Sequence, residues 1–402
     1  MFSKELLSAV AAISFVSGAA AVSCSDPTAT VASAADATQV ANCQTIKGSV
    51  LISTTAGPDI NIGGELTEIG GDLVCENNGA IHSLQSSSLE TIGGIFQLKN
   101  VTQLNSLSFP ALGEVGSIDW ATLNSLPEPT FGTPGITKAK SVTIADTFIE
   151  TIDGINVESL TDMNINNNRR LTKFSSSIKS LSNALYIQAN GLNLTMEMPN
   201  LEWIANMTIA NVTSLTVPSL KTVNGSMRFD SNYFENFLAA NLTQIQEGDL
   251  SFVSNPQLQN ISFPVLEKVG GGLTIANNTA LGKINGFGAL QDVGGAVIFR
   301  GSMDDIELPK LENVVGTLVA ISTEDLTDSC NTLNKLSGGV IQGTVTTCHG
   351  NDMDANNDTS SDTSGDGSSS SGDKKGAASF AGVSMPTIVS LAAFGTFFTA
   401  FL

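Results

Sequence analysis

A pair of apolar residues separated by one position recurs every 20 to 24 residues along most of the chain. Alternate side chains of a β-strand share one face, so each pair marks the inward face of a short strand. A globular domain does not restart the same strand at so even a step, whereas a solenoid must. The sequence therefore predicts a mainly β fold, either a right-handed parallel β-helix or a leucine-rich-repeat-like solenoid. The thirteen pairs are Val50/Ile52, Leu73/Cys75, Phe96/Leu98, Ile118/Trp120, Val142/Ile144, Met163/Ile165, Leu185/Ile187, Met207/Ile209, Met227/Phe229, Leu250/Phe252, Leu273/Ile275, Val297/Phe299 and Leu318/Ala320.

The residues that flank each strand also repeat. A Leu-x-x-Ile/Val-Gly-Gly motif precedes several strands, as at Leu66–Gly71 and Leu266–Gly271. A glycine at this position permits the positive φ with which the chain can turn a corner. Asn or Asp often follows the strand directly, and these side chains bond their own backbone and tolerate turn geometry. In a solenoid they could also bond the next coil; the residues are Asn77, Asn100, Asp146, Asn167, Asn211 and Asn277.

One segment, Pro127–Gly135, contains three prolines and interrupts the repeat. We interpret it as a loop that bulges from its coil, because proline lacks a backbone donor and breaks regular pairing. A junction between two lobes of the solenoid is the alternative interpretation.

An open solenoid must cover the apolar faces of its two end coils, which predicts helical caps. Near the N-terminus, Asp26 suits a helix N-cap and Pro27 the first helical position, and Ala-rich sequence extends to Val40. Near the C-terminus, the helix candidate is Asn331–Leu336.

Four of the five cysteines bracket these caps. In the oxidising secretory route, the simplest pairing is two local disulfides, Cys24–Cys43 and Cys330–Cys348. Cys75 would then be a buried, inert thiol, because it occupies an inward strand position. A Cys43–Cys75 bond that leaves Cys24 free is the alternative.

The two ends of the chain carry targeting signals. Residues 1–21 have a charged Lys4, an apolar stretch and small residues at the cleavage position, which indicates a signal peptide. After the solenoid and its caps, assigned to residues 22–350, residues 351–376 form a Ser/Asp-rich stalk that is predicted to be disordered. Small residues from Gly376 and an apolar tail to Leu402 predict a GPI anchor at Gly376 and removal of residues 377–402. A transmembrane helix is the alternative, but no positive residues follow the tail.

Nine Asn-x-Ser/Thr sequons behind a signal peptide indicate a glycoprotein. The net charge of −20 argues against nucleic acid as a partner and favours solubility. The predicted N-glycosylation sites are Asn100, Asn193, Asn206, Asn211, Asn224, Asn241, Asn260, Asn277 and Asn357.

Several segments together are typical of one family: Cys43–Ile52, Asn164–Leu171, Val269–Thr279, Cys330–Leu336 with Gly338–Gln342 and Cys348, and the anchor region Lys374–Ala378. They resemble the fungal GPI-anchored cell-wall organisation proteins of the extracellular-mutant/sporulation-specific type, whose bodies are similar to receptor L-domains. The resemblance covers nearly the whole chain, and Cys75 is an extra cysteine relative to the family pattern. It implies a non-catalytic role in cell-wall organisation and integrity, on the outer face of the plasma membrane and in the wall. Lys374 and Lys375 resemble the dibasic signal that favours retention at the membrane.

The sequence contains no catalytic constellation, so we predict no catalytic residues, no metal ligands, no cofactor and no enzyme activity. Carboxylates such as Asp119 and Asp230 are scattered, and His82 and His349 belong to no triad or metal motif. The expected partners are wall polysaccharide or wall-biogenesis proteins, and the membrane through the GPI lipid. A wall-polysaccharide-binding module is the alternative function, and a polysaccharide-active β-helix enzyme the third. For that module Trp203 and Tyr186 are the aromatic candidates, while Trp120 is assigned to the core.

Overall fold

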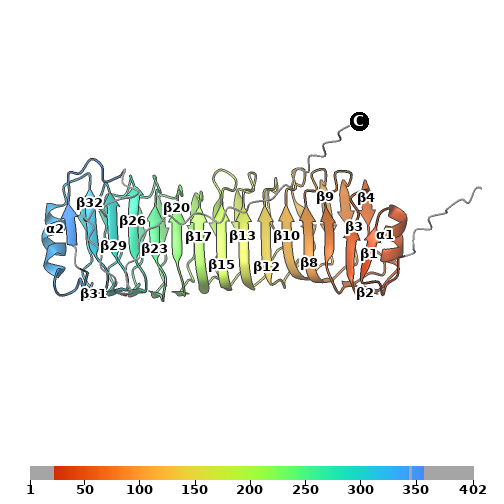
Figure 1. The fold of residues 1–402 in the computed structure, drawn as a ribbon, viewed down its shortest axis with the longest axis horizontal. Helices are drawn as coiled ribbons and strands as arrows, with labels where there is room; N and C mark the ends of the chain where they lie inside the picture. The colour runs from red at the N-terminus through yellow and green to blue at the C-terminus, as the bar shows by residue number, and fades with distance from the viewer. Residues whose placement is uncertain (1–21, 344–345, 357–402) are drawn as a thin grey trace, which may run out of the picture. The chain divides into compact units, whose positions relative to one another are not determined.

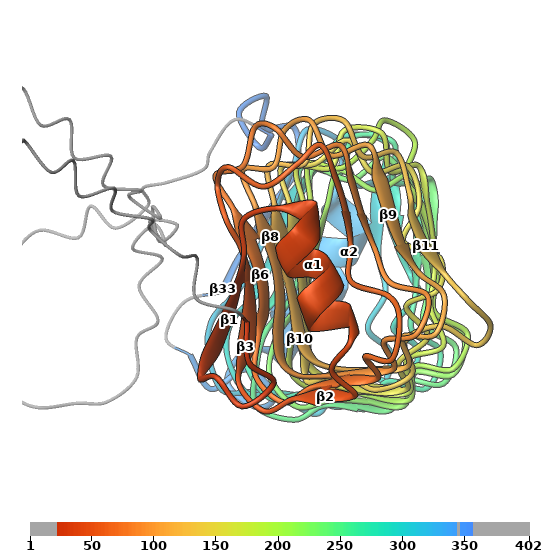
Figure 2. The ribbon, with the colours of Figure 1, turned by 90° about the vertical axis from the view of Figure 1, so that its right-hand side faces the viewer.

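The computed structural model describes residues 22–343 and 346–356, which form a parallel β-solenoid. Each coil contributes one strand to a main sheet, and most coils contribute a second strand to the opposite side (Figures 1 and 2). The ladders between these strands are parallel throughout the described residues. The long strands of the main sheet are β1 (Thr28–Val31), β3 (Ser49–Ile52), β6 (Leu73–Glu76), β8 (Thr91–Lys99), β10 (Glu114–Ala121), β12 (Ser141–Ala145), β13 (Ser159–Asn166), β15 (Ser180–Gln188), β17 (Trp203–Ala210), β20 (Met227–Asp230), β23 (Leu250–Val253), β26 (Leu273–Asn278), β29 (Val297–Gly301), β32 (Leu318–Ser322) and β33 (Thr346–His349).

Short strands at the corner before the long ones belong to the same sheet: β2 (Thr45–Ile46), β5 (Glu68–Ile69), β19 (Thr222–Val223), β22 (Gln244–Ile245), β25 (Lys268–Val269), β28 (Asp292–Val293) and β31 (Asn313–Val314). The second side is divided into four small sheets. Their strands are β4 (Asp59–Asn61), β7 (Ser83–Gln85), β9 (Ser106–Phe109) and β11 (Pro129–Phe131); β14 (Lys173–Ser175), β16 (Thr195–Glu197) and β18 (Ser214–Thr216); β21 (Asn236–Leu238) and β24 (Asn260–Ser262); and β27 (Lys283–Ile284) and β30 (Asp305–Ile306).

The predicted inward pairs stack in register from coil to coil, which confirms the solenoid. Val50 lies opposite Leu73, and Leu73 lies opposite Phe96. The same alignment continues to the last pair, where Val297 lies opposite Leu318. All of these side chains are at most 2% exposed. Burial of each large apolar side chain stabilises the fold by about 1.5–3 kcal/mol, so the interior column holds the coils together.

The glycines at the corners are required for a different reason from the one that the motif suggested. The expectation of positive φ at Gly70 and Gly294 is wrong, because neither has φ in the left-handed region. Instead, the backbone of the previous coil passes directly beneath them. A Cβ atom on Gly294 would lie 2.0 Å from the carbonyl oxygen of Gly270, and one on Gly70 would lie 2.7 Å from that of Lys47. The glycines therefore permit close stacking of successive corners.

The Asn and Asp residues after the strands adopt the turn geometry that the sequence predicted. Asn77, Asn100 and Asp146 have φ of 52°, 52° and 54°. Some also bond along the stack, since Asn100 Nδ2 donates to Asn77 Oδ1 over 2.9 Å. One residue further on, a second column of asparagines is buried inside the corner, and the sequence pattern did not identify it. Its members are Asn78, Asn168, Asn190, Asn232, Asn255 and Asn278, of which Asn190 is partly exposed.

Both caps contain helices, but their boundaries differ from those predicted. Helix α1 (Ala34–Ala41) begins after Ser33, whose hydroxyl accepts from the amide of Asp36, so the N-cap is Ser33 and the prediction of Asp26 is wrong. Residues 28–31 instead form β1, because their alternating pattern pairs in register with β3. At the other end, α2 (Thr327–Leu333) begins four residues before the predicted start, and a 3₁₀ turn (Asn334–Leu336) follows it.

The proline-rich segment is not simply a bulging loop. Pro129–Phe131 forms β11, which pairs with β9 and continues the second side of the solenoid. The interruption lies one coil later, in residues 146–157, where an isolated bridge between Ile136 and Ile155 replaces the second-side strand. The main sheet passes through this region in register from β10 to β12 and β13. The described residues up to Asn356 form one compact unit, so the segment does not separate two lobes.

The packed part of the chain includes residues beyond position 350, the predicted end of the solenoid and its caps. Ala355 is buried, and Asn356 Nδ2 donates to Ser302 Oγ over 2.8 Å, so residues 351–356 pack on the last coils. Neither helix in the described residues has the length and apolarity needed to cross a bilayer.

Candidate functional site

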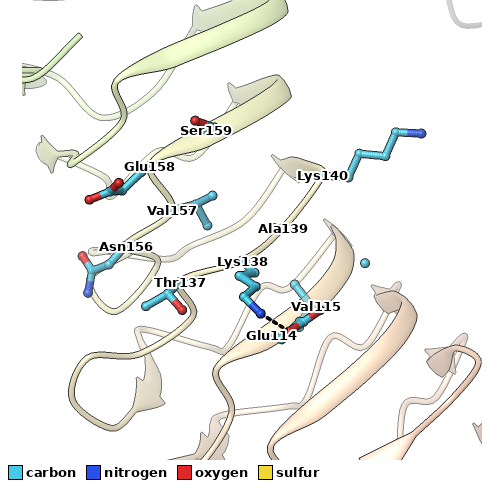
Figure 3. Close-up of a pocket in the computed structure, with 11 residues that line it drawn as sticks. Glu114, Val115, Thr137, Lys138, Ala139, Lys140, Asn156, Val157, Glu158 and Ser159 are labelled. Atoms are coloured by element: carbon cyan, nitrogen blue, oxygen red, sulfur yellow. Dashed lines mark hydrogen bonds and ion pairs between the residues drawn. The ribbon is translucent and has the colours of Figure 1, made fainter.

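Two hollows adjoin at the middle of the solenoid. The second lies beside β11, where the second side is interrupted, and the first lies at the corner that leads into β10 and β13 of the main sheet. The first measures about 660 Å³ and the second about 720 Å³, and both open widely to solvent. They share Thr137, Asn156 and Glu158 in their linings, so we describe them together as the mid-solenoid groove. Figure 3 shows the first hollow, with its lining drawn from three successive coils. The groove is lined by residues 114–116, 128–134, 137–140, 151, 153–154, 156–159 and 177.

The groove exists because β11 has no strand beside it on the next coil. That coil turns early, and its backbone crosses close to the segment after β11. Gly135 and Gly154 have φ of 79° and 89°, and a Cβ atom on Gly135 would lie 2.2 Å from the carbonyl oxygen of Gly154. Asn156 fixes the crossing, since its Nδ2 donates to the carbonyl oxygen of Pro134 over 2.5 Å. This early turn leaves the open space between β11 and β14.

The lining combines an aromatic ring with many polar groups. Phe131 is half-buried and stacks on the buried Trp120 with 6.3 Å between ring centroids. Its support by the core holds the ring in place at the side of the groove. The remaining lining is rich in groups that donate or accept hydrogen bonds: Thr130, Thr133, Thr137, Thr151, Asn156 and Ser159.

Charges of both signs occur in the groove. Lys138 Nζ lies 2.8 Å from Glu114 Oε2, and Figure 3 shows this ion pair. The hydrogen bond from Lys138 to Glu114, and then the carboxylate's charge, raise the pKa of the lysine. Glu158 Oε2 forms an ion pair with Lys179 Nζ of the next coil at 2.7 Å. Within the described residues, Glu128 and Asp153 form no ion pair, so their carboxylates remain open to other donors.

Eight of the nine predicted glycosylation sites fall in the described residues, and none is buried. Asn100, Asn193, Asn206, Asn241 and Asn260 are exposed, and the other three are half-buried. The asparagines of all nine sequons lie outside residues 101–192, and every lining residue of the groove lies inside that stretch. Asn357, the predicted anchor residue Gly376, the signal peptide and the tail lie outside the described residues.

The structure contains the two disulfides of the simplest predicted pairing. Cys24 is bonded to Cys43 beside α1, and Cys330 is bonded to Cys348 at the other cap. Cys75 is unpaired and fully buried. Burial, assisted by the nearby charge of Glu76, raises the pKa of its thiol to about 12. The thiol is therefore protonated at neutral pH and inaccessible to reagents.

The aromatic candidates do not form a site together. Trp120 belongs to the core, as predicted. Tyr186 faces outward from β15, its hydroxyl bonds to Gln188, and partial burial raises its pKa. Trp203 lies half-buried at the start of β17, opposite Ser180 and not beside Tyr186.

The scattered acidic and histidine candidates also remain apart. Asp119 pairs with Lys99 over 2.6 Å on the main sheet, and Asp230 accepts a hydrogen bond from Ser231. His349 lies 3.1 Å from Asp352 near the C-terminal cap, and His82 lies exposed before β7. In residues 22–343 and 346–356, no group of three or more His, Cys, Asp or Glu side chains is placed to hold a metal. In the sequence, the proline-rich segment Pro127–Gly135 was the feature that coincided with the groove, but its pattern predicted a loop and not a hollow.

Comparison with known proteins identifies close relatives along most of the chain. It is 36% identical over 352 residues to Protein ecm33 of Aspergillus fumigatus, and the match covers 85% of each chain. It is 35% identical over 310 residues to Sporulation-specific protein 2 of Saccharomyces cerevisiae, covering 77% of this chain and 61% of that protein. It is also 33% identical over 319 residues to the Cell surface GPI-anchored protein of Arthroderma benhamiae, covering 79% and 81%.

The match spans less than two thirds of the sporulation-specific protein, but most of the length of the other two. No protein-family model matches the chain. No solved structure matches it either.

Proposed function

The chain belongs to the family of fungal cell-surface proteins that includes Protein ecm33 and Sporulation-specific protein 2, and we propose that it organises the cell wall without catalysing a reaction. The observation that carries this proposal is the match to Protein ecm33 over 85% of both chains. A relative in Schizosaccharomyces pombe is named Cell wall protein ecm33, and one in Candida albicans is named Cell surface GPI-anchored protein ECM33. We place this protein on the outer face of the plasma membrane and in the wall, held by a GPI lipid at Gly376.

The architecture supports a display role. A solenoid presents a long surface, since each coil contacts only its neighbours and adds to the same faces. The acidic composition keeps that surface soluble, and the sequons add glycans to it. A Ser/Asp-rich stalk before the anchor would hold the solenoid away from the membrane.

The proposal of a non-enzyme is supported by two of the four groove carboxylates, because each of these two is held in an ion pair. Glycoside hydrolysis requires two carboxyl groups that face one bond, one of them protonated. Glu114 and Glu158 are held by Lys138 and Lys179. The lysines occupy oxygens of these two carboxylates, which opposes a role for either as the group that delivers a proton to a leaving group.

A deletion strain tests the function. We expect it to become sensitive to dyes that perturb the wall, and we expect the full-length gene to restore resistance. A secreted form that lacks residues 357–402 should fail to restore it, because the proposed role requires the anchor. Full rescue by this secreted form, or cleavage or transfer of glucan by the purified protein, would refute the proposed function.

A further inference from the structure

We propose that the mid-solenoid groove binds a neutral polysaccharide chain of the wall. The proposal rests on the proposed function, which brings the protein to the wall, and it assigns the ligand class to one place on the solenoid. The groove is suited to a chain because its two hollows adjoin and open widely to solvent. Each has a volume in the range of ligand sites, about 300–1,000 Å³, but neither encloses its occupant as a small-molecule site does.

The lining chemistry fits sugar hydroxyls. Hydroxyls both donate and accept, and the groove offers Thr, Ser and Asn side chains that do the same. The open carboxylates Glu128 and Asp153 are strong acceptors for a hydroxyl donor. Phe131 supplies an apolar face, held by Trp120, against which the C–H face of a sugar ring can pack.

The charged residues of the groove disfavour binding of an anionic polysaccharide. Glu114, Glu128, Asp153 and Glu158 line the groove, against the two lysines Lys138 and Lys140. Glu114 holds Lys138 and Glu158 holds Lys179. Within the described residues, the unpaired charges of the lining are therefore Glu128 and Asp153 against Lys140, a small excess of negative charge where the ligand would lie. The whole chain carries −20, which adds repulsion of nucleic acid or phosphorylated polymers.

The distribution of sequons leaves this region free for a ligand. Asn100 precedes the sequon-free stretch and Asn193 follows it, and seven sequons occur between residues 193 and 277. Glycans attached there belong to coils beyond the groove. The second side at the groove therefore carries no attachment point of its own.

A single substitution can place a glycan in the groove. Glu158→Thr completes an Asn-x-Thr sequon at Asn156, which is exposed and lines both hollows. The matched control is Glu202→Thr, which completes a sequon at the exposed Asn200 outside the groove lining. Both substitutions remove an equivalent ion pair, Glu158–Lys179 at 2.7 Å and Glu202–Lys221 at 2.9 Å. The pair of variants thus differs in where the new glycan lies.

Binding is measured with full-length protein released from intact cells, with occupancy of the new sequon checked by mass spectrometry. The probes are particulate β-1,3-glucan, chitin and mannan, with soluble oligosaccharides of the polymer that binds. We expect Glu158→Thr to raise the Kd at least about tenfold and Glu202→Thr to change it less than about twofold. A second variant, Glu128→Ala/Asp153→Ala, removes the open carboxylates without adding a glycan and should also weaken binding. Its control is Glu235→Ala/Glu267→Ala, two exposed carboxylates on other coils.

Equal binding by the two sequon variants and by the carboxylate variant would overturn the assignment to the groove. Failure of wild-type protein to bind any neutral polymer, or preference for chitosan or for an extended peptide, would overturn the ligand class. These results are separate from the deletion phenotype. If wild-type protein rescues the strain but binds no polysaccharide, the inference fails and the proposed function stands. If the protein binds polysaccharide but its deletion leaves the wall unchanged, the proposed function fails and the assignment of the ligand stands.

Discussion

The buried asparagine column should contribute strongly to the stability of the solenoid, and Asn255→Ala tests this. Asn255 is fully buried and links three coils. Its Oδ1 accepts from the amide of Asn232 over 2.8 Å, and its Nδ2 donates to Asn278 Oδ1 over 2.9 Å. Nδ2 also donates to the carbonyl oxygen of Phe229 over 3.2 Å.

The magnitude follows from the groups that the substitution leaves behind. The amide of Asn232 would lose its acceptor inside the protein, and an unsatisfied buried donor costs about 1–3 kcal/mol. The lost bonds to Asn278 and Phe229 cost about 1 kcal/mol each. We therefore expect the free energy of unfolding to fall by about 3–5 kcal/mol. The matched control is Ser254→Gly on the same coil, which has φ of 56° and accepts one side-chain bond, from Asn277 Nδ2. Glycine tolerates that φ, so the control should cost less than about 1 kcal/mol.

Urea unfolding followed by circular dichroism measures the difference. The midpoint should fall for Asn255→Ala by an amount on the order of 1 M more than for Ser254→Gly. Hydrogen exchange provides a local measurement, because interactions in a solenoid extend mainly to neighbouring coils. The amide of Asn232 should exchange faster in Asn255→Ala. Equal midpoints for the two variants, with unchanged exchange at Asn232, would show that the column does not carry the stability assigned to it.

Three further predictions concern packing, titration and processing. Gly294→Ala should destabilise the protein by at least about 2 kcal/mol in urea unfolding, because its Cβ would lie 2.0 Å from the Gly270 oxygen; Gly288→Ala, with nothing within 4 Å, is the control. Burial raises the pKa of the Cys75 thiol to about 12, so its contribution to the free energy of unfolding is complete below the unfolded pKa of about 9 and is lost as the pH rises toward 12. Cys75→Val should remove this part of the loss of stability at alkaline pH. Identical dependence of stability on pH in the variant and the wild-type protein would contradict the prediction. Mass spectrometry of the mature C-terminal peptide should find the GPI anchor on Gly376, and a peptide that ends at Leu402 would contradict this prediction.

The sequence alone determined the repeating part of this protein. An inward pair such as Leu73/Cys75 is readable because a strand has a strict period of two and a solenoid restarts it at a regular step. The post-strand Asn77 was likewise predictable, since its turn geometry depends on its own backbone. The cap cysteines were paired from their spacing and the secretory compartment, since both bonds close short local loops.

Other features of the protein depend on contacts between coils and follow only from its tertiary structure. Gly294 is required by a carbonyl oxygen on the preceding coil, and no property of its own segment shows that crossing. The segment 28–31 forms β1 and not a helix because β3 offers it a pairing edge, a tertiary interaction that overrides local propensity. The mid-solenoid groove arises in the same way. Pro129–Phe131 forms a strand, and the hollow beside it exists because the next coil, at Gly154, turns before it can supply a partner.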